Sequence, residues 1–189
     1  MKPGHSLRLE KNQHEEVENT CMSGLDTRLA GIELVIFDVD GVMTDGTVWV
    51  DIDGRESIRF NIQDAYGVFR GYRVGLQYAI ISGRECEAVE HRAGVLRITH
   101  VYQGQTFKQE AFEKVLSEVG LETEQIGYMG DDLNDLPIME QVGVACSVAN
   151  GRPEVREAAD LVTEARGGEG AVREFLEMII SAKGGIPGP

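Results

Sequence analysis

The segment Leu34–Gly46 is the feature of the sequence that most restricts the fold. It opens with four consecutive apolar residues, a pattern typical of a strand that is buried on both faces, as in parallel sheets. The apolar run ends in Asp38 and Asp40, one residue apart, and in Gly41. Carboxylates at the carboxyl end of such a strand lie at the edge of the sheet where open α/β folds bind their ligands.

Two carboxylates this close repel each other unless a cation or a shared proton neutralises them. Mg2+ meets this need, because it accepts one or two carboxylates together with water and phosphate oxygens. An Asp-Gly pair after a strand is also common as a simple turn. The segment therefore indicates either a magnesium site or a turn, and residues elsewhere in the sequence are needed to distinguish the two.

The composition restricts the partners of the protein. The chain has 189 residues, of which 42% are hydrophobic, and a net charge of −14. Nucleic-acid binding needs a basic face, so this charge argues against a nucleic-acid partner. No apolar run suits a secretion signal or a membrane span, and Cys21, Cys86 and Cys146 show no disulfide or zinc spacing. We therefore expect a cytoplasmic protein that does not bind membranes.

The order of strand-like and helix-like segments predicts the fold class. Residues 25–183 alternate between the two, which predicts one α/β domain with a doubly wound, Rossmann-like parallel sheet and helices on both faces. Residues 1–24 are polar and predict a flexible tail, with a short helix around Glu15–Glu18. Residues 184–189 predict a second flexible tail.

Residues 47–60 predict a projecting β-hairpin. Apolar residues occupy alternate positions from Val48 to Ile52, and Asp53-Gly54 is a strong hairpin turn. An apolar hairpin that projects from a small domain is more stable in an oligomer interface than in water. The alternative is that the hairpin, which carries Trp49, packs on its own domain.

Capping residues predict the starts of two helices. Asp64 is expected to cap a helix that ends near Tyr72, and Thr106 is expected to cap a helix that ends near Val119. In the second of these helices, Lys108 falls in the first turn.

Polar residues of complementary kinds follow the strands or open a helix at one edge of the predicted sheet. Each alone has a simpler explanation, because Ser-Gly turns are common, helix lysines are usually solvated and Asp-rich turns cap helices. Together they supply an anionic nucleophile, a metal cradle, a hydroxyl donor and a fixed cation, which is the set needed for phosphoryl transfer. The set comprises Asp38, Asp40, Ser82, Lys108, Asp131, Asp132 and Asp135.

Over residues 32–180 the chain resembles the haloacid dehalogenase superfamily of phosphotransferases. DVDGVMTDG, IISGR, Lys108 and GDDLND match the first to fourth motifs of that superfamily, in order. The resemblance implies that Asp38 attacks phosphorus and forms an aspartyl-phosphate. It implies that Asp40 is the general acid and then the base for the hydrolytic water.

The same resemblance implies the remaining roles. Mg2+ would be held by Asp38, the backbone carbonyl of Asp40, and Asp131, while Ser82 and Lys108 would bind the phosphoryl oxygens. Two further residues would support the site. Asp135 would orient Lys108 or a metal-bound water, and Asp132 would either assist the site or cap a helix.

Many members of the superfamily insert a cap domain between these motifs, and this chain has no room for one. The chain looks most like the capless sugar-acid branch, typified by the 3-deoxy-D-manno-octulosonate 8-phosphate (KDO 8-phosphate) phosphatases. DVDGVMTDG followed by a hairpin, FNIQDAYGV, SGRE and RGGEGAVRE carry this resemblance. It implies a homotetramer assembled through the hairpin and a small acidic sugar phosphate as substrate.

Such a substrate carries a carboxylate as well as a phosphate. Arg84 and Arg166 could bind the carboxylate by bidentate hydrogen bonds, and Gly41 and Gly83 are also expected to contact substrate. Arg173 is expected to form a surface salt bridge instead. Tyr66 follows FNIQD at a position where relatives often have small residues, and both a substrate contact and simple packing remain open for it.

The resemblance implies hydrolysis of KDO 8-phosphate in lipopolysaccharide precursor synthesis. The alternative substrate is a nine-carbon keto-deoxy acid phosphate of the KDN or sialic-acid type, for which an acidic residue in place of Arg84 would be more typical. A phospho-accepting signalling module is a distant alternative, because a general acid two residues after the nucleophile serves turnover. A catalytically silent homologue has no support, since every catalytic position holds a competent residue.

Overall fold

A single parallel sheet forms the centre of the protein. The computed structural model describes residues 24–186. In the sheet, the six strands follow the order β5-β4-β1-β6-β7-β8, and every neighbouring pair is parallel. The chain builds one half of the sheet on each side of β1, so the predicted doubly wound α/β class is confirmed. The strands are β1 (Leu34–Phe37), β4 (Gln77–Ile81), β5 (His100–Tyr102), β6 (Ile126–Gly130), β7 (Val144–Ser147) and β8 (Leu161–Val162).

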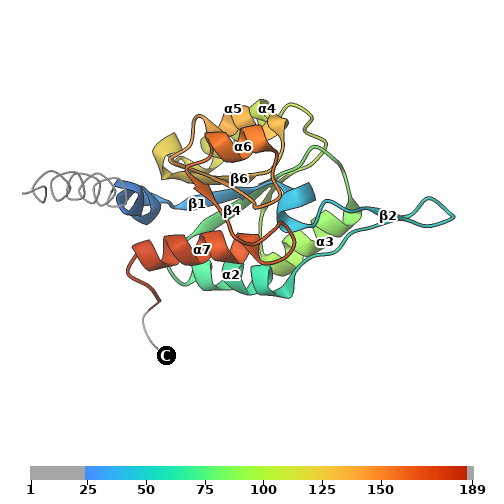
Figure 1. Cartoon of the computed structure of the whole chain (residues 1–189), viewed down its shortest axis with the longest axis horizontal. Helices are drawn as coiled ribbons and strands as arrows, with labels where there is room; N and C mark the ends of the chain where they lie inside the picture. Colours follow the sequence, from blue (N-terminus) through green and yellow to red (C-terminus); the bar gives the residue numbers. More distant parts are fainter. Residues whose placement is uncertain (1–23, 187–189) are drawn as a thin grey trace, which may run out of the picture.

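Helices cover both faces of the sheet (Figure 1). On one face lie α2 (Ile62–Tyr72), α3 (Glu87–Leu96) and α7 (Ala171–Ala182). On the other lie α4 (Gln109–Val119), α5 (Leu136–Met139) and α6 (Pro153–Ala158). No cap domain interrupts the described residues. Short helical turns complete the fold at η1 (Val39–Met43), η2 (Thr123–Gln125) and η3 (Leu133–Asp135).

Strand β1 connects two hydrophobic cores. Val35 and Phe37 pack into the core beneath α2, α3 and α7, and Leu34 and Ile36 pack into the core beneath α4, α5 and α6. All four side chains are fully buried. This is the burial on both faces that the apolar run predicts, and it fixes the point at which the chain leaves the sheet.

Two glycines in α2 lower its helical propensity but allow close packing. A Cβ on Gly67 would lie 3.0 Å from the Cα of Arg173 in α7. A Cβ on Gly71 would lie 1.8 Å from the hydroxyl oxygen of Tyr78 in β4. The glycines therefore let α2 approach both α7 and the sheet.

The predicted hairpin is present and projects from the domain (Figure 1). Its strands, β2 (Trp49–Val50) and β3 (Glu56–Ser57), are shorter than the alternating pattern predicts. Ile58 and Phe60 leave the strand pairing because they pack against the core under α2. The tip is fully solvated: Ile52 is completely exposed.

Both predicted helix caps are wrong. Asn61 caps α2, and its side chain accepts the N–H of Gln63 at 2.8 Å. Asp64 lies inside the first turn of α2 and is buried, because its carboxylate binds α7 instead. Thr106 precedes the start of α4, where Lys108 occupies the N-cap position.

The ends of the chain bear on several predictions. Residues 24–31 form a helix that the sequence does not predict. The predicted helix around Glu15–Glu18 lies outside the described residues, as do residues 1–23 of the first predicted tail and residues 187–189 of the second. Within the described part of the chain, no helix combines the length and the apolar character needed to cross a membrane.

Candidate active site

The predicted polar residues meet at the carboxyl edge of the sheet. Asp38 follows β1, Ser82 follows β4 and Asp131 follows β6, and these three strands are neighbours in the sheet. Lys108 reaches the same edge from the start of α4. Because parallel strands end at one edge, four residues far apart in the sequence come together there.

Lys108 is buried between two carboxylates. Its side chain is 1% exposed, and its Nζ lies 2.8 Å from Oδ1 of Asp38 and 2.6 Å from Oδ1 of Asp135. Burial acts to lower the pKa of Lys108, but the charges and hydrogen bonds of Asp38 and Asp135 outweigh it and raise the pKa. The lysine is therefore a permanent cation that fixes the carboxylate of Asp38.

Asp135 is held more tightly than any other residue of the site. Its Oδ1 accepts hydrogen bonds from Lys108 and, at 2.7 Å, from the hydroxyl of Tyr128. Its Oδ2 accepts the N–H groups of Asp131 at 2.9 Å and Asp132 at 3.1 Å. With both oxygens occupied, Asp135 orients Lys108 and the backbone that carries Asp131.

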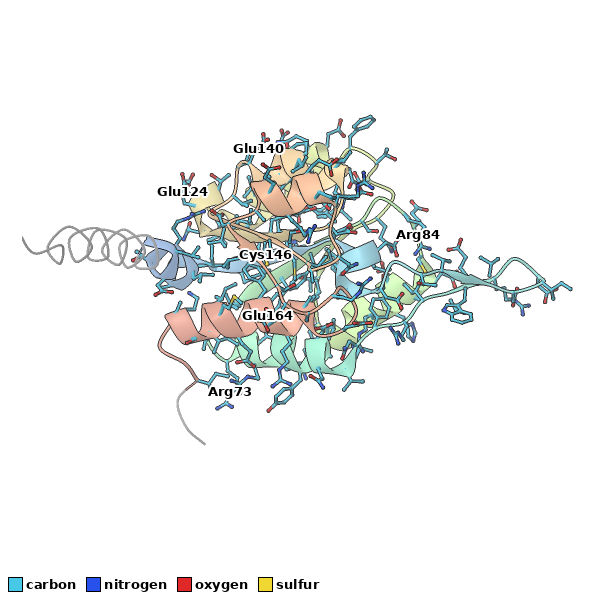
Figure 2. The ribbon with its side chains drawn as sticks, in the orientation of Figure 1. Arg73, Arg84, Glu124, Glu140, Cys146 and Glu164 are labelled. Atoms are coloured by element: carbon cyan, nitrogen blue, oxygen red, sulfur yellow. The ribbon has the colours of Figure 1, made fainter. Side chains whose placement is uncertain are left out.

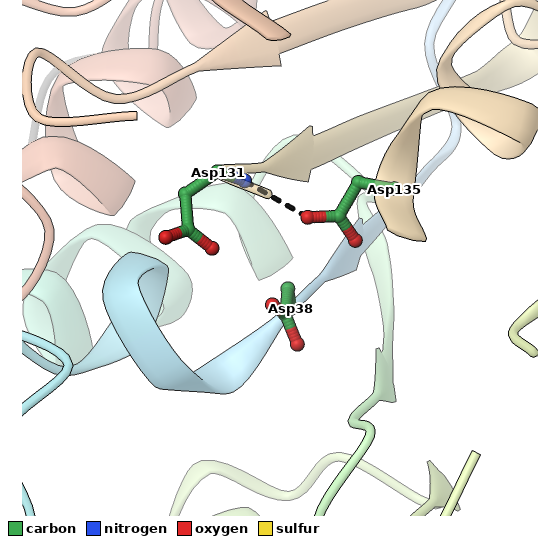
Figure 3. Close-up of side chains that lie close together, drawn as sticks. All are labelled: Asp38, Asp131 and Asp135. Carbon is green, nitrogen blue, oxygen red and sulfur yellow. Dashed lines mark hydrogen bonds between the residues drawn. The ribbon is translucent and has the colours of Figure 1, made fainter. Parts of the chain in front are cut away.

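Asp38, Asp131 and Asp135 form a group that could hold a metal ion (Figure 3). Each offers an oxygen within 4.8 Å of the others. Oδ1 of Asp131 is buried without a hydrogen-bond partner, whereas both oxygens of Asp135 are occupied. A divalent cation would pair with the orphaned oxygen, so Asp38 and Asp131 are the better ligands and the residues present fit Mg2+.

The carboxyl groups of this site resist ionisation when no cation is bound. Burial raises the pKa of Asp131 to about 8, with the charges of Asp38 and Asp135 adding to the shift. Burial also raises the pKa of Asp38 to about 6, although Lys108 opposes it. A bound cation would favour the ionised carboxylates and so oppose both shifts.

Gly41 determines how closely the loop after β1 approaches Asp131. Its φ of +91° lies in the left-handed region, and a Cβ there would lie 2.1 Å from Oδ2 of Asp131. The structure therefore gives Gly41 a steric role in the site.

Asp40 and Arg84 form a bidentate ion pair. The Nε and Nη2 atoms of Arg84 lie 2.8 Å from Oδ2 and Oδ1 of Asp40, and Nη1 contacts Glu56 of the hairpin. These acidic partners, the Asp40 hydrogen bonds foremost, raise the pKa of Arg84. Arg84 thus ties the hairpin to the loop after β1, near the base of the hairpin (Figure 2). The sequence gives no sign of the part played by Glu56.

Ser82 and Gly83 link the loops around the site. Ser82 is buried, its N–H donates to the carbonyl of Tyr102 at 2.8 Å, and its carbonyl accepts the N–H of Gln105 at 2.9 Å. Gly83 is exposed, and a Cβ there would lie 3.8 Å from Nδ2 of Asn134, in the loop after β6. Ser82 therefore lies inside the site, and Gly83 lies at its mouth.

The remaining predicted residues lie outside the buried group. Asp132 is exposed and caps η3, where it accepts the N–H of Leu133 at 2.7 Å. Arg166 is exposed in the loop before α7. Arg173 lies 3.5 Å from Glu177 and over the ring of Tyr66, at 5.1 Å from the ring centroid. The structure thus gives Arg173 a surface ion pair and Tyr66 a packing contact.

Sequence reasoning missed Tyr128, Glu56, Asn61 and the role of Asp64. Tyr128 appears in the sequence as one apolar residue of a buried strand, although its hydroxyl binds Asp135. Tyr128 could have been recognised as a polar aromatic residue two positions before the end of β6, the strand that leads to Asp131.

Comparison with known proteins gives consistent matches. Residues 84–176 match a family model described as haloacid dehalogenase-like hydrolase. A relative from Salmonella typhi, named 3-deoxy-D-manno-octulosonate 8-phosphate phosphatase KdsC, is 41% identical over 145 residues, 77% of each chain. KdsC of Escherichia coli K12 is 43% identical over 140 residues, 74% of each chain.

Solved structures agree with these relatives. The crystal structure of 3-deoxy-D-manno-octulosonate 8-phosphate phosphatase from Yersinia pestis superposes with a TM-score of 0.84 at 41% identity, covering 86% of this chain and 88% of the other. The corresponding enzyme from Moraxella catarrhalis, in complex with a magnesium ion, a phosphate ion and KDO, also gives 0.84 at 36% identity, covering 86% and 94%.

Proposed function

Because the chain belongs to the haloacid dehalogenase-like hydrolases, in the family of the KDO 8-phosphate phosphatases, we propose that it is a Mg2+-dependent phosphatase that hydrolyses KDO 8-phosphate. The products are the free sugar acid and phosphate, in the synthesis of lipopolysaccharide precursors. The observation that carries the proposal is the arrangement of buried Asp38 and Lys108 beside half-buried Asp131 at the edge of the sheet. The relatives reported above are named for the eight-carbon substrate, which favours it over the nine-carbon alternative and over a signalling module.

The first step transfers the phosphoryl group to the protein. A carboxylate oxygen of Asp38 attacks phosphorus, and the bond between phosphorus and the sugar oxygen breaks. Asp40, released from Arg84 and protonated, gives its proton to that oxygen. Lys108, 2.8 Å from Asp38, fixes the nucleophile and balances charge on the phosphoryl oxygens. Asp135 keeps Lys108 in place, and the hydroxyl of Ser82 donates to the phosphoryl group.

The second step regenerates Asp38. Water attacks the aspartyl-phosphate, Asp40 takes the proton of the water, and the bond between phosphorus and Asp38 breaks. When bound by Asp38, Asp131 and the backbone carbonyl of Asp40, Mg2+ supplies positive charge for the phosphoryl oxygens. The N–H groups bound to Asp135 hold Asp131 in position for this task.

The carboxylate of the substrate would bind at the exposed arginines. The guanidinium of Arg84 is occupied by Asp40 and Glu56 in this structure, so binding substrate there requires an exchange of partners. Arg166 takes part in none of the ion pairs formed among residues 24–186, and is therefore the better candidate. Gly83, where a Cβ would meet no atom closer than 3.8 Å, leaves room for the substrate beside these residues.

Phosphate release from a panel of sugar phosphates, with Mg2+ or EDTA, tests the proposal. Wild-type protein is expected to prefer KDO 8-phosphate over nine-carbon acids and neutral sugar phosphates. Asp38→Asn is expected to abolish the activity, because the amide cannot act as the nucleophile. Asp26→Asn, the same change on the exposed helix before β1, is the matched control. Equal weak activity on every substrate would contradict the substrate assignment.

We also propose a homotetramer, assembled through the hairpin, in the cytoplasm. The exposed apolar side chains of Trp49, Val50 and Ile52 support an interface there, and the free thiols of Cys86 and Cys146 fit a reducing compartment. Sedimentation of Ile52→Ser is expected to show a smaller species than wild type. An unchanged mass would contradict assembly through the hairpin.

A further inference from the structure

The loop at residues 164–170, which joins β8 to α7, lies directly on the loop that follows β1. The N–H of Gly168 donates to the carbonyl of Val42 at 3.0 Å. A Cβ on Gly167 would lie 1.7 Å from the carbonyl oxygen of Gly41. Arg166 therefore directly precedes a backbone contact with Gly41, the residue after Asp40, and these contacts determine its position.

Helix α7 begins without a capping side chain of its own. Its N-cap is Gly170, with a φ of +110°, so the first N–H groups of the helix need acceptors from elsewhere. Asp64 of α2 supplies one: its Oδ1 accepts the N–H of Arg173 at 2.9 Å. A negative side chain at a helix N-terminus is also favoured by the helix dipole. Asp64 therefore fixes the end of the loop.

Asn61 holds the loop from the same side. Its Oδ1 accepts the N–H of Gln63 and caps α2, while its Nδ2 donates to the carbonyl of Gly168 at 3.2 Å. One side chain thus both caps α2 and holds the loop, and a mutation can remove the second contact while keeping the first. Asn61 and Asp64 lie one turn apart and bind the loop and the start of α7.

Other contacts fix the opposite end of the loop. The side chain of Glu174 accepts the N–H groups of Glu164 and Ala165 at 2.8 and 2.9 Å, and Asn150 accepts the N–H of Gly167 at 2.8 Å. In contrast, the side chain of Arg166 is exposed and pairs with no acidic group among the described residues. A loop held this firmly presents one unpaired cation beside the site.

We propose that Asn61 and Asp64 are positioning residues for substrate specificity: they hold the loop at 164–170 so that Arg166 meets the carboxylate of the sugar acid. This rests on the proposed function. An arginine binds a carboxylate best through two parallel hydrogen bonds, which demand a fixed approach. Positioning Arg166 affects only substrates that carry the second anionic group. A merely structural role would affect every phosphate ester equally.

Asn61→Asp separates the two purposes of Asn61. The aspartate still caps α2, but it cannot donate to Gly168. With KDO 8-phosphate, KM is expected to rise about fivefold, the loss typical of one hydrogen bond, with little change in kcat. With p-nitrophenyl phosphate, which has no carboxylate, both constants are expected to stay unchanged. Asp64→Asn keeps an acceptor for the N–H of Arg173. It is expected to raise KM for KDO 8-phosphate by a smaller factor and to leave both constants for p-nitrophenyl phosphate unchanged.

A double-mutant cycle with Arg166→Ala completes the test. Arg166→Ala is expected to raise KM for KDO 8-phosphate further than Asn61→Asp does, and the effect of Asn61→Asp is expected to vanish in the Arg166→Ala background. Hydrogen exchange at the N–H of Gly168 is expected to accelerate in Asn61→Asp while exchange in α2 stays constant.

Three results would overturn the proposal. They are equal losses of activity on both substrates, additive effects in the cycle, and unchanged exchange at Gly168. Absence of KDO 8-phosphate hydrolysis by wild-type protein would instead overturn the proposed substrate, and this proposal with it. Wild-type activity combined with an unchanged KM in Asn61→Asp would overturn this proposal alone.

Discussion

The buried carboxylates around Lys108 and the exposed arginines at the mouth of the site balance their charges differently. Lys108 is 1% exposed and has two carboxylate partners inside the protein. Arg84 is 28% exposed and pairs with acids that also face solvent, and Arg166 pairs with none of the described acids. In the interior each charge depends on the others, because water is excluded. At the mouth, water can replace a partner, so Arg84 can exchange Asp40 or Glu56 for a ligand at low cost.

Removing the buried cation is expected to have the largest effect. Lys108→Met leaves Asp38 and Asp135 buried together without a positive charge, so phosphatase activity should fall by more than about a thousandfold. The stability should fall as well, since breaking a buried ion pair typically costs about 3–5 kcal/mol. Phosphate release and urea unfolding measure the two effects.

Lys114→Met is the matched control, because it makes the same change at an exposed position of α4. It is expected to leave both quantities near those of wild type. Equal effects of the two variants would contradict the distinction between the buried and the exposed charges.

The raised pKa values of Asp38 and Asp131 also predict that stability depends on pH and that Mg2+ restores the stability lost at high pH. Their folded pKa values, about 6 for Asp38 and about 8 for Asp131, lie above the ordinary value of 3.8. Without metal, the folded state therefore binds more protons than the unfolded state between about pH 4 and pH 8. Stability in EDTA should fall as the pH rises through this range, and Mg2+ should restore it.

Melting temperatures at pH 5.5 and pH 8.5, with EDTA or Mg2+, test this prediction. The increase caused by Mg2+ should be larger at pH 8.5, because protons compete with the cation at the lower pH. Asp131→Asn should reduce both the pH dependence of the melting temperature in EDTA and the rise in melting temperature caused by Mg2+. An increase that is the same at both pH values would contradict the raised pKa values.

A change at the mouth of the site is expected to have the smallest effect. Arg84→Lys keeps the charge but loses the planar fork that binds Asp40. The kcat/KM for KDO 8-phosphate should fall about tenfold, while the free energy of unfolding changes by less than about 1 kcal/mol. Arg55→Lys, at an exposed hairpin position, is the control. A larger loss of stability in Arg84→Lys than in Lys108→Met would reverse the comparison.

Local patterns predicted the sheet and the positions of the polar residues around it. The apolar run of β1 and the carboxylates after it need only neighbouring residues to be recognised, and the parallel sheet then brings Asp38, Ser82, Lys108 and Asp131 together. Their roles in catalysis stay predictions that the variants above test.

Contacts between distant segments were not predictable in the same way. Asp64 is a reasonable cap for α2 by local rules, yet it binds Arg173, 109 positions further along the chain. Arg84 is separated from Asp40 by 44 positions, and no periodicity reveals that pair. The hairpin strands are shorter than their pattern predicts, because Phe60 is drawn to the core. In each case packing overrode local preference.

The approach of Gly41 to Asp131 has a consequence for how the site can be lost. A single methyl group at position 41 would occupy the space of a carboxylate oxygen. A chain with alanine there would keep every reactive group and still be unable to seat the cation. The site could then be lost through a position that contributes no functional group at all, and a search for missing catalytic residues in a defective variant would overlook it.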